Sequence, residues 1–415
     1  MKSLYICYYG IRESLVQNQV LPYLRELVKN GTEVHLMTFE SSNENRITDD
    51  QRSRLRDELG LRGITWTDMV YHGKPKIFST IYDIFAGMRF IIRECRKHEF
   101  DILHARALVP AVMARLARFA GRLDTKILFD LRGLIIEEYL DAGVLSRSNP
   151  LVPVMRTMEL GTINAADGVV VLTDAIRREL FPSVVDGLDS KGRPIERIPC
   201  CFDDAKFVFP TEAQRIESKK RFGLEKSLVG IYTGSVSGVY LIDEMCKVFA
   251  GFRKIHPQFF PIILSRGDFN QVKEEMKRNG FGDNEFIVTS VEPSGVGDYL
   301  SASDFAVAFY SATFSRLATS PTKNAEYLAM GLPILTNSGI GDTERELTDD
   351  RTGVVVRDFN EESIDGAVAG IVRLLSEGDE MRRRCRASAE QRYSLEKLGG
   401  PSYRRIYDRL SREDH

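Results

Sequence analysis

Residues 320–337 contain side chains whose types and spacing suit the binding of an anion. Ser320 is a good helix N-cap, Pro321 suits the first helical position, and Gly331 is placed to end the helix. The N-terminus of a helix presents free N–H groups and a positive dipole end, and Lys323 adds a full charge in the first turn. We expect a phosphate group there.

A carboxylate on the same helix indicates what accompanies the phosphate. Glu326 lies one turn after Lys323 on the same face, where a carboxylate can accept two hydrogen bonds from a vicinal diol such as a ribose. Phosphate beside ribose predicts a nucleotide. The alternative is a surface helix with an i,i+3 Lys–Glu pair worth about 0.2–0.5 kcal/mol, and these residues alone leave both readings open.

The predicted helix follows an apolar run, residues 305–309, that is typical of a buried strand. Strand and helix patterns alternate along both halves of the chain, which predicts an α/β fold with parallel sheets. We expect two doubly wound, Rossmann-like domains over 1–202 and 211–394, joined by a linker over 203–210. A C-terminal helix over 395–415 is expected to pack back on the first domain. Such sheets bind ligands at the carboxyl ends of their strands.

Two successive predicted strands of the first domain end in polar residues. His104 and Arg106 follow one strand, and Asp130 and Arg132 follow the next. Because the carboxyl ends of parallel strands share one edge of a sheet, we favour a ligand-facing cluster. The alternative is a structural ion pair such as Asp130–Arg132.

Composition and charge restrict the class of protein. With 415 residues the chain exceeds the usual size of one hydrophobic core, and 43% hydrophobic with 28% charged residues is typical of a globular protein. A net charge of −2 argues against nucleic-acid binding. Six cysteines without C-x-x-C spacing fit a reduced, cytoplasmic setting, and we predict no signal peptide and no membrane-spanning helix.

The most apolar predicted helix covers residues 78–93. We favour a helix packed in the core, and the alternative is that it docks on a membrane or on a lipid-linked acceptor. A peripheral contact at the inner membrane face would then be made through the first domain.

Several segments, in order, resemble the GT-B glycosyltransferases of family 4. The strongest are Ser320-Pro321-Thr322-Lys323, Glu326-Tyr327-Leu328-Ala329 and Gly331-Leu332-Pro333-Ile334, and shorter ones are Phe129-Asp130-x-Arg132-Gly133, Ile198-Pro199-Cys200-Cys201, Gly339-x-Gly341-Asp342 and Gly353-Val354. The resemblance covers most of the chain.

The resemblance implies a UDP- or GDP-linked sugar as donor, held by the second domain. Glu326 matches the family's ribose-binding glutamate, while Ser320, Thr322 and Lys323 lie where the helix meets the diphosphate, so that Lys323 also serves catalysis. Such enzymes usually retain the anomeric configuration, use no bound metal and need no cofactor beyond the nucleotide sugar. The implied setting is surface polysaccharide or glycoconjugate synthesis.

The first domain is expected to bind a glycan or a lipid-linked acceptor. The candidate acceptor-binding residues are Gly10, Arg12, Glu13, Arg106, Arg132 and Glu137. His104 or Asp130 can orient or deprotonate an acceptor hydroxyl. In a retaining front-face reaction the leaving phosphate can take that proton, so a strong protein base is not required.

Two departures from the family pattern matter for the donor. Ala318 replaces the usual first glutamate, and Gly234-Ser235 replaces the usual Gly-Arg…Lys pair, so the diphosphate would depend on Lys323, Arg316 and Arg266 together with serine and backbone donors. Two rival hypotheses remain: a related enzyme such as a nucleotide-sugar 2-epimerase or phosphorylase, and a non-catalytic nucleotide-sugar-binding subunit.

Overall fold

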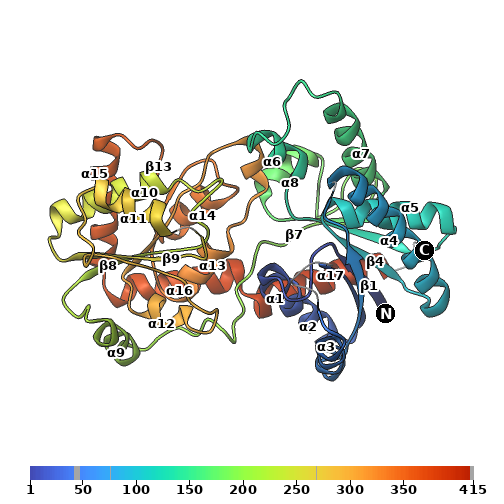
Figure 1. Ribbon diagram of the computed structural model, residues 1–415, viewed down its shortest axis with the longest axis horizontal. Coiled ribbons are helices and arrows are strands. Elements are labelled where there is room, and N and C mark those ends of the chain that lie inside the picture. Colours follow the sequence, from blue (N-terminus) through green and yellow to red (C-terminus); the bar gives the residue numbers. More distant parts are fainter. Residues whose placement is uncertain (42–46, 75, 268, 412–415) are drawn as a thin grey trace. The chain divides into compact units, whose positions relative to one another are not determined.

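The computed structural model describes residues 1–41, 47–74, 76–267 and 269–411 (Figure 1). The chain forms two compact units, Met1–Pro199 with Leu395–His415 in the first and Cys200–Ser394 in the second. The segment 203–210, which we expected to be a linker, belongs to the second unit, where Phe207 is part of the buried core. The last four residues of the expected C-terminal helix lie outside the described residues.

Within the described residues, the first unit has a seven-stranded parallel sheet in the order β3-β2-β1-β4-β5-β6-β7. Its strands are β1 (Lys2–Cys7), β2 (Glu33–Ser41), β3 (Ile64–Tyr71), β4 (Ile102–Arg106), β5 (Lys126–Leu131), β6 (Gly168–Val171) and β7 (Ile195–Arg197). Strand β1 pairs with β2 and β4, with Tyr5 opposite His104. The strand order reverses between β1 and β4, which is where doubly wound sheets bind ligands.

Helices connect these parallel strands, as the alternating pattern predicted. They are α1 (Ser14–Gln19), α2 (Leu21–Lys29), α3 (Asp49–Leu61), α4 (Lys76–His98), α5 (Leu108–Gly121), α6 (Ile135–Asp141), α7 (Leu151–Ala165) and α8 (Asp174–Leu180). The unit also contains α17 (Gly400–Ser411), which follows the second unit along the chain. Helix α17 follows a π-helical segment, Leu395–Gly399, and packs on the first unit, with Ile406 fully buried.

Helix α4 is only partly a core helix. Phe90 and Ile91 in its second half are buried, whereas Phe78, Ile81 and Phe85 in its first half are exposed. The expectation that the apolar side chains of this helix pack in the core therefore holds for Phe90 and Ile91 but not for Phe78, Ile81 and Phe85. No helix in the described part of the chain is both long and apolar enough to cross a bilayer.

The second unit repeats the architecture with a parallel sheet in the order β10-β9-β8-β11-β12-β13. Its strands are β8 (Leu228–Thr233), β9 (Phe259–Leu264), β10 (Ile287–Thr289), β11 (Phe305–Ala308), β12 (Ile334–Asn337) and β13 (Gly353–Val356). Its helices are α9 (Glu212–Phe222), α10 (Ile242–Ile255), α11 (Phe269–Arg278), α12 (Val296–Ser301), α13 (Thr322–Ala329), α14 (Thr343–Asp350), α15 (Glu361–Leu375) and α16 (Asp379–Tyr393). Every residue of β11 is buried, as its apolar run predicted, because helices cover both faces of a parallel sheet.

Candidate active site

Helix α13 begins differently from the prediction. Pro321 is the N-cap residue, and its side chain makes no capping hydrogen bond. The Ser320 hydroxyl instead accepts a hydrogen bond from the backbone N–H of Cys200 at 3.1 Å. The N-cap prediction for Ser320 is wrong, because a partner distant in sequence takes the hydroxyl. Gly331 follows the helix with a φ of +78°, in the conformation expected of the glycine that ends it.

Three tyrosine rings surround the ammonium group of Lys323. Its Nζ lies 4.2 Å from the ring centroid of Tyr232, 4.4 Å from that of Tyr240 and 5.4 Å from that of Tyr310. The Nζ atom is buried and has no hydrogen-bond partner among the described residues. Burial lowers the pKa of Lys323 to about 7, although the charge of Glu326 acts in the opposite direction. The rings attract the cation but do not neutralise it, so the site can accept an anion.

Gly234, the residue after β8, allows the ammonium group to approach the backbone. Its φ is +136°, and a Cβ atom at this position would lie 2.6 Å from the Nζ atom of Lys323. The end of β8 is held by Tyr327 of α13, whose hydroxyl accepts a hydrogen bond from the Thr233 N–H at 2.8 Å. Gly234 and Lys323, two of the residues predicted to contact the diphosphate, thus lie next to each other.

Two further polar side chains of α13 have no hydrogen-bond partner among the described residues. Glu326 is partly exposed, and burial raises the pKa of its carboxyl to about 7 against the effects of Lys206 and Lys323. Asn324 is 2% exposed, and neither its Nδ2 nor its Oδ1 is paired. A buried amide without partners costs about 1–3 kcal/mol, and a ligand would recover this. Sequence analysis missed Asn324, although its place between Lys323 and Glu326 was visible.

The other predicted donor-binding residues lie on loops of the second unit. Arg316, from the 3₁₀ turn Phe314–Ala318, is within 3.4 Å of the Thr319 hydroxyl, and its charge acts on the phenol of Tyr240. The Ser235 hydroxyl accepts a hydrogen bond from the Ser237 N–H at 3.3 Å. Arg266 is exposed after β9, and within the described part of the chain it makes no cation–π contact with the tyrosines around Lys323.

Two more residues considered in the sequence analysis, Thr322 and Ala318, lie at or just before the start of α13. Thr322 is the first residue of α13, and Ala318 ends the preceding turn with its methyl group buried. Ala318 therefore offers no side-chain hydrogen bond where the family pattern has a glutamate. The donor-binding role of Thr322 stays a prediction.

In the first unit, His104 and Asp130 are 0% exposed and are bonded to α17. The Tyr403 hydroxyl donates to Asp130 Oδ2 at 3.0 Å, and the Tyr407 hydroxyl lies 2.8 Å from His104 Nδ1. The His104 Nε2 atom is 3.7 Å from Asp130 Oδ2. Both side chains are thus enclosed by the protein, and their predicted catalytic role finds no support in this arrangement.

The charge of Asp130 is balanced within the first unit. Burial alone would raise the pKa of its carboxyl, but Arg132, His104 and Arg106 hold that pKa well below its usual range. The nearest guanidinium nitrogens are 3.6 Å away for Arg106 and 3.5 Å away for Arg132. Both arginines also lie near Gln19 Oε1, at 3.0 and 3.5 Å. The structural alternative for this cluster, an ion pair, describes what is observed.

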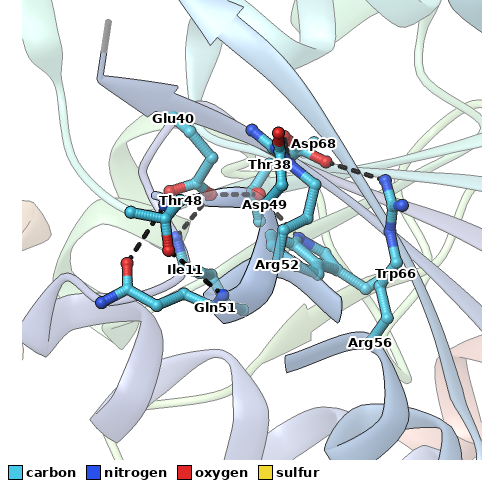
Figure 2. A network of polar contacts seen from close by, with 10 residues as sticks. All are labelled: Ile11, Thr38, Glu40, Thr48, Asp49, Gln51, Arg52, Arg56, Trp66 and Asp68. Carbon is cyan, nitrogen blue, oxygen red and sulfur yellow. Dashed lines mark hydrogen bonds and ion pairs between the residues drawn. The ribbon is translucent and has the colours of Figure 1, made fainter. Parts of the chain in front are cut away.

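The loop after β1 is fixed by a buried carboxylate. Figure 2 shows Glu40 of β2 between Ile11 and Thr38. It accepts hydrogen bonds from the Ile11 N–H at 2.7 Å and from the Thr38 hydroxyl at 2.5 Å, and Trp66 of β3 donates to that hydroxyl at 2.9 Å. Burial raises the pKa of Glu40. Sequence analysis missed Glu40, because Ile11, the loop residue that it fixes, lies 29 positions away along the chain.

The predicted acceptor-binding residues near this loop differ in exposure from Glu137, which was predicted for the same role. Arg12 and Glu13 are exposed, while Gly10 is buried and its N–H donates to Glu13 Oε1 at 2.9 Å. Glu137 of α6 is instead paired with Arg156 of α7, with 2.9 Å between Arg156 Nε and Glu137 Oε1. Arg12 and Glu13 are thus exposed at the loop, whereas Glu137 is engaged in an interhelical ion pair.

Cysteines and potential metal ligands complete the description. All six cysteines are buried and free. In the described ranges, no group of three or more His, Cys, Asp or Glu side chains is arranged to hold a metal ion.

Residues 16–206 match the model of Glycosyltransferase Family 4. This region is similar to the glycosyltransferases of family 4. A comparison with curated proteins found no match to the sequence. The resemblance noted from sequence motifs, and the prediction of a glycosyltransferase, are confirmed by the family match.

Solved structures similar to the glycosyltransferase establish its fold as GT-B, as predicted. Sucrose-phosphate synthase from Thermosynechococcus elongatus is 12% identical, with a TM-score of 0.67 over 98% of this chain and 100% of that chain. HepE from Anabaena, in complex with UDP-glucose, is 14% identical, with a TM-score of 0.69 over 99% of each chain. WaaG, a glycosyltransferase involved in lipopolysaccharide biosynthesis, is 12% identical, with a TM-score of 0.67 over all of both chains.

Proposed function

We propose that the glycosyltransferase transfers a sugar from a UDP- or GDP-linked donor, which the second unit binds, to a glycan or lipid-linked acceptor. The observation that carries the proposal is the buried ammonium of Lys323, which lacks a hydrogen-bond partner among the described residues and lies among three tyrosines beside Gly234. An isolated buried cation is costly, and a diphosphate would offset that cost. The similar protein HepE is in complex with UDP-glucose, which agrees with this class of donor.

The remaining groups of α13 fit the rest of the donor. The Glu326 carboxylate suits the ribose diol, and the uncapped first turn of α13 adds N–H groups and a positive dipole end near the diphosphate. As the bond to the diphosphate breaks, negative charge grows on its oxygens, and Lys323 stabilises that charge. We therefore infer a metal-independent transfer, and the family resemblance leads us to propose retention of configuration.

The exposed half of α4 supports a lipid-linked acceptor in surface polysaccharide or glycoconjugate synthesis. Phe78, Ile81 and Phe85 are 73%, 46% and 53% exposed, and their i, i+3, i+7 spacing puts them on one side of the helix. An apolar stripe of this kind can contact lipid at a membrane surface. We propose a peripheral contact at the cytoplasmic face, in keeping with six free cysteines.

A thermal-shift and calorimetry screen of UDP-, GDP- and other nucleotide sugars tests the donor. A ligand that binds the native state raises its unfolding temperature. We expect a UDP- or GDP-sugar to bind, Glu326→Ala to weaken binding, and purified chain to transfer the sugar to a lipid-linked glycan. An unchanged affinity in Glu326→Ala would exclude the ribose assignment. Binding without turnover across a broad acceptor panel would favour the non-catalytic subunit.

A further inference from the structure

Helix α4 carries a stripe of exposed side chains of two chemical kinds. Within residues 78–98, the exposed side chains are Phe78, Ile81, Tyr82, Phe85, Arg89, Arg93, Arg96 and Lys97. The first four are apolar or aromatic, and the last four are cationic. The acidic residues of this range are not among them, because Asp83 is buried and Glu94 is only partly exposed. The exposed surface of the helix therefore combines apolar and positive groups.

The spacing places both kinds of side chain on one side of the helix. Steps of three or four residues lead along the stripe from Phe78 to Arg96, and such steps return to the same side of an α-helix. With a rise of about 1.5 Å per residue, the stripe is roughly 30 Å long. Phe85 ends its apolar half and Arg89 begins its cationic half. A surface that faces the stripe must therefore be apolar at one end and anionic at the other.

The cations of the second half are not neutralised by their neighbours. Arg89, Arg96 and Lys97 form no ion pair with another residue in the described part of the chain. Arg93 lies 3.0 Å from Glu94, yet its side chain is 69% exposed, and an exposed pair of this kind contributes little. Exposed cations without partners attract a surface that carries negative charge.

The apolar half of α4 is held at the carboxyl edge of the first sheet. Asp83, on the buried side of the helix, accepts a hydrogen bond from the Tyr8 hydroxyl at 2.6 Å, and Tyr8 follows β1. The other oxygen of Asp83 lies 2.6 Å from Nδ1 of His72, which follows β3. Further along, a Cβ atom on Gly87 would lie 2.6 Å from the Met113 sulfur of α5, so the two helices are in close contact. The exposed stripe thus lies on a fixed element.

We propose that α4 docks the protein on a bilayer that contains anionic phospholipids. Phe78, Ile81 and Phe85 enter the headgroup region, and the cations of the second half pair with lipid phosphates. Because the two kinds of side chain are separated along the helix axis, the first half of the helix lies deeper than the second. This inference deepens the proposed function and rests on it, since it names the class of lipid that the peripheral contact requires.

The deeper end of α4 is the end next to the strand ends of the first sheet. A lipid-linked acceptor carries its glycan on a headgroup at the level of the lipid phosphates. Docking through α4 therefore brings the carboxyl edge of this sheet, where Tyr8 and His72 lie, close to that level. The first unit can then bind the acceptor without extracting it from the bilayer.

Other partners match the stripe less well. A second copy of the chain would bring two cationic stripes together, and residues 78–98 offer no exposed carboxylate to pair with them. An acidic protein would suit the cations but would leave Phe78, 73% exposed, and Tyr82, 60% exposed, without an apolar counterpart. An anionic bilayer supplies both phosphate groups and hydrocarbon.

Flotation of the full chain with lipid vesicles tests the class of lipid. We expect binding to vesicles made of equal parts of phosphatidylcholine and phosphatidylglycerol. Binding to phosphatidylcholine alone should be at least about tenfold weaker, because each cation near an anionic surface strengthens binding about fivefold. Raising the salt concentration from about 0.1 M to about 1 M shortens the screening length from about 10 Å to about 3 Å, so binding should weaken. Equal binding to both kinds of vesicle, or binding to neither, would overturn the inference.

Two double variants test the cationic half at an equal change in net charge. Arg89→Gln with Arg96→Gln should weaken binding to the anionic vesicles about 25-fold, which is the effect of losing two such cations. The control, Lys220→Gln with Arg383→Gln, removes two exposed cations of the second unit and should bind as the wild type does. Equal losses in the two would assign the binding to net charge and overturn the role of α4.

A further pair of variants tests the apolar half. Phe78→Ser with Phe85→Ser should weaken vesicle binding about tenfold or more, because two exposed aromatic rings no longer enter the bilayer. The unfolding temperature should not change, since both rings are exposed. The control is Leu61→Ser with Ile216→Ser, on α3 and α9, where the side chains are 90% and 56% exposed. Equal losses in the two double variants would contradict docking through α4.

Nucleotide-sugar affinity, measured by calorimetry without vesicles, separates this inference from the proposed function. The α4 variants should keep the wild-type affinity. Wild-type protein that binds the nucleotide sugar but no anionic vesicle contradicts the docking inference alone. Wild-type protein that binds anionic vesicles but no nucleotide sugar contradicts the proposed function and leaves docking supported. A dimer that the α4 variants abolish would assign the stripe to a second copy of the chain and overturn the inference.

Discussion

Each unit of the glycosyltransferase buries a charged group near the carboxyl ends of its strands, but the two charges have opposite surroundings. In the first unit, Asp130 accepts a hydrogen bond from Tyr403 and lies within 4 Å of two arginines. In the second unit, the ammonium of Lys323 has aromatic rings around it and no hydrogen bond within the described residues. One charge is satisfied by the protein and the other is not.

The surroundings of the two charges distinguish a structural cluster around Asp130 from a binding site around Lys323. A buried charge that its neighbours more than compensate has a pKa that keeps it charged, as the lowered pKa of Asp130 illustrates. A buried charge without compensation moves toward neutrality, as the pKa of Lys323 at about 7 illustrates. Loss of the Asp130 charge should therefore reduce stability, and loss of the Lys323 charge should reduce ligand binding.

The largest effect is expected from Lys323→Met. The variant keeps an unbranched side chain among the tyrosines but removes the cation that would face the diphosphate. We expect transfer to fall at least ~10²-fold, as is typical when one stabiliser of developing negative charge is lost. Steady-state kinetics and calorimetry measure this, with Lys254→Met as a control, because Lys254 is paired with Glu361 on the surface. If Lys323→Met bound the nucleotide sugar with normal affinity, Lys323 would not be a ligand-binding charge and would not differ from Asp130 in this respect.

Asp130→Asn should act on stability and leave the affinity for the nucleotide sugar unchanged. Without the carboxylate, Arg106 and Arg132 face each other in a buried site, and breaking such a cluster costs about 3 kcal/mol. Urea unfolding measures the change. The matched control is Asp298→Asn at the exposed pair with Arg221, where we expect less than about 1 kcal/mol. A comparable loss in the free energy of unfolding for the two variants would show that the Asp130 cluster does not stabilise the protein.

Gly234→Ala should have an intermediate effect. Its Cβ would lie 2.6 Å from Lys323 Nζ and would displace the ammonium, so we expect nucleotide-sugar affinity to fall about tenfold, or about 1.4 kcal/mol. Gly238→Ala is a control from the same loop, because it also has a positive φ but nothing lies within 4 Å of its Cβ. Calorimetry compares the two. Equal losses would point to backbone strain instead of the position of Lys323.

The smallest effect concerns protons exchanged during donor binding. Lys323 and Glu326 both have a pKa of about 7 in the unliganded protein. A diphosphate favours the charged lysine, so binding at pH 8 should take up a fraction of a proton. Hydrogen bonds from the ribose diol favour the charged carboxylate of Glu326, so binding at pH 6 should release a fraction of a proton.

Calorimetry of a nucleotide sugar in buffers of different ionisation enthalpy measures this exchange. Lys323→Met should abolish the uptake at pH 8, and Glu326→Gln should abolish the release at pH 6. Uptake that persists in Lys323→Met would assign the titration to another group.

The sequence was sufficient for the elements and their order, because these depend on local patterns. The apolar run at β11 and the glycine after α13 each act within a few residues. The start of α13 was misassigned because Ser320 has the right type for a cap, yet Cys200 takes its hydroxyl. The local preference of serine for the cap position was overridden by a hydrogen bond to a residue 120 positions away along the chain.

Much of the candidate site depended on contacts that no local pattern shows. The tyrosines around Lys323 come from β8, from the loop before α10 and from the residues after β11, so only the fold brings their rings together. His72 and Asp83, which hold α4 to the strand ends, are 11 positions apart, and no motif marks them. Lys323 and Glu326 were identified early because they share one helix.

Helix α17 has a consequence for the order in which the protein can fold during synthesis. The sheet of the first unit is complete once β7 has been made, yet Tyr403 and Tyr407, which contact Asp130 and His104, follow about two hundred residues later along the chain. An emerging first unit would therefore hold its buried charges without these partners while the ribosome makes the whole second unit. The first unit to be translated is the last that can be completed.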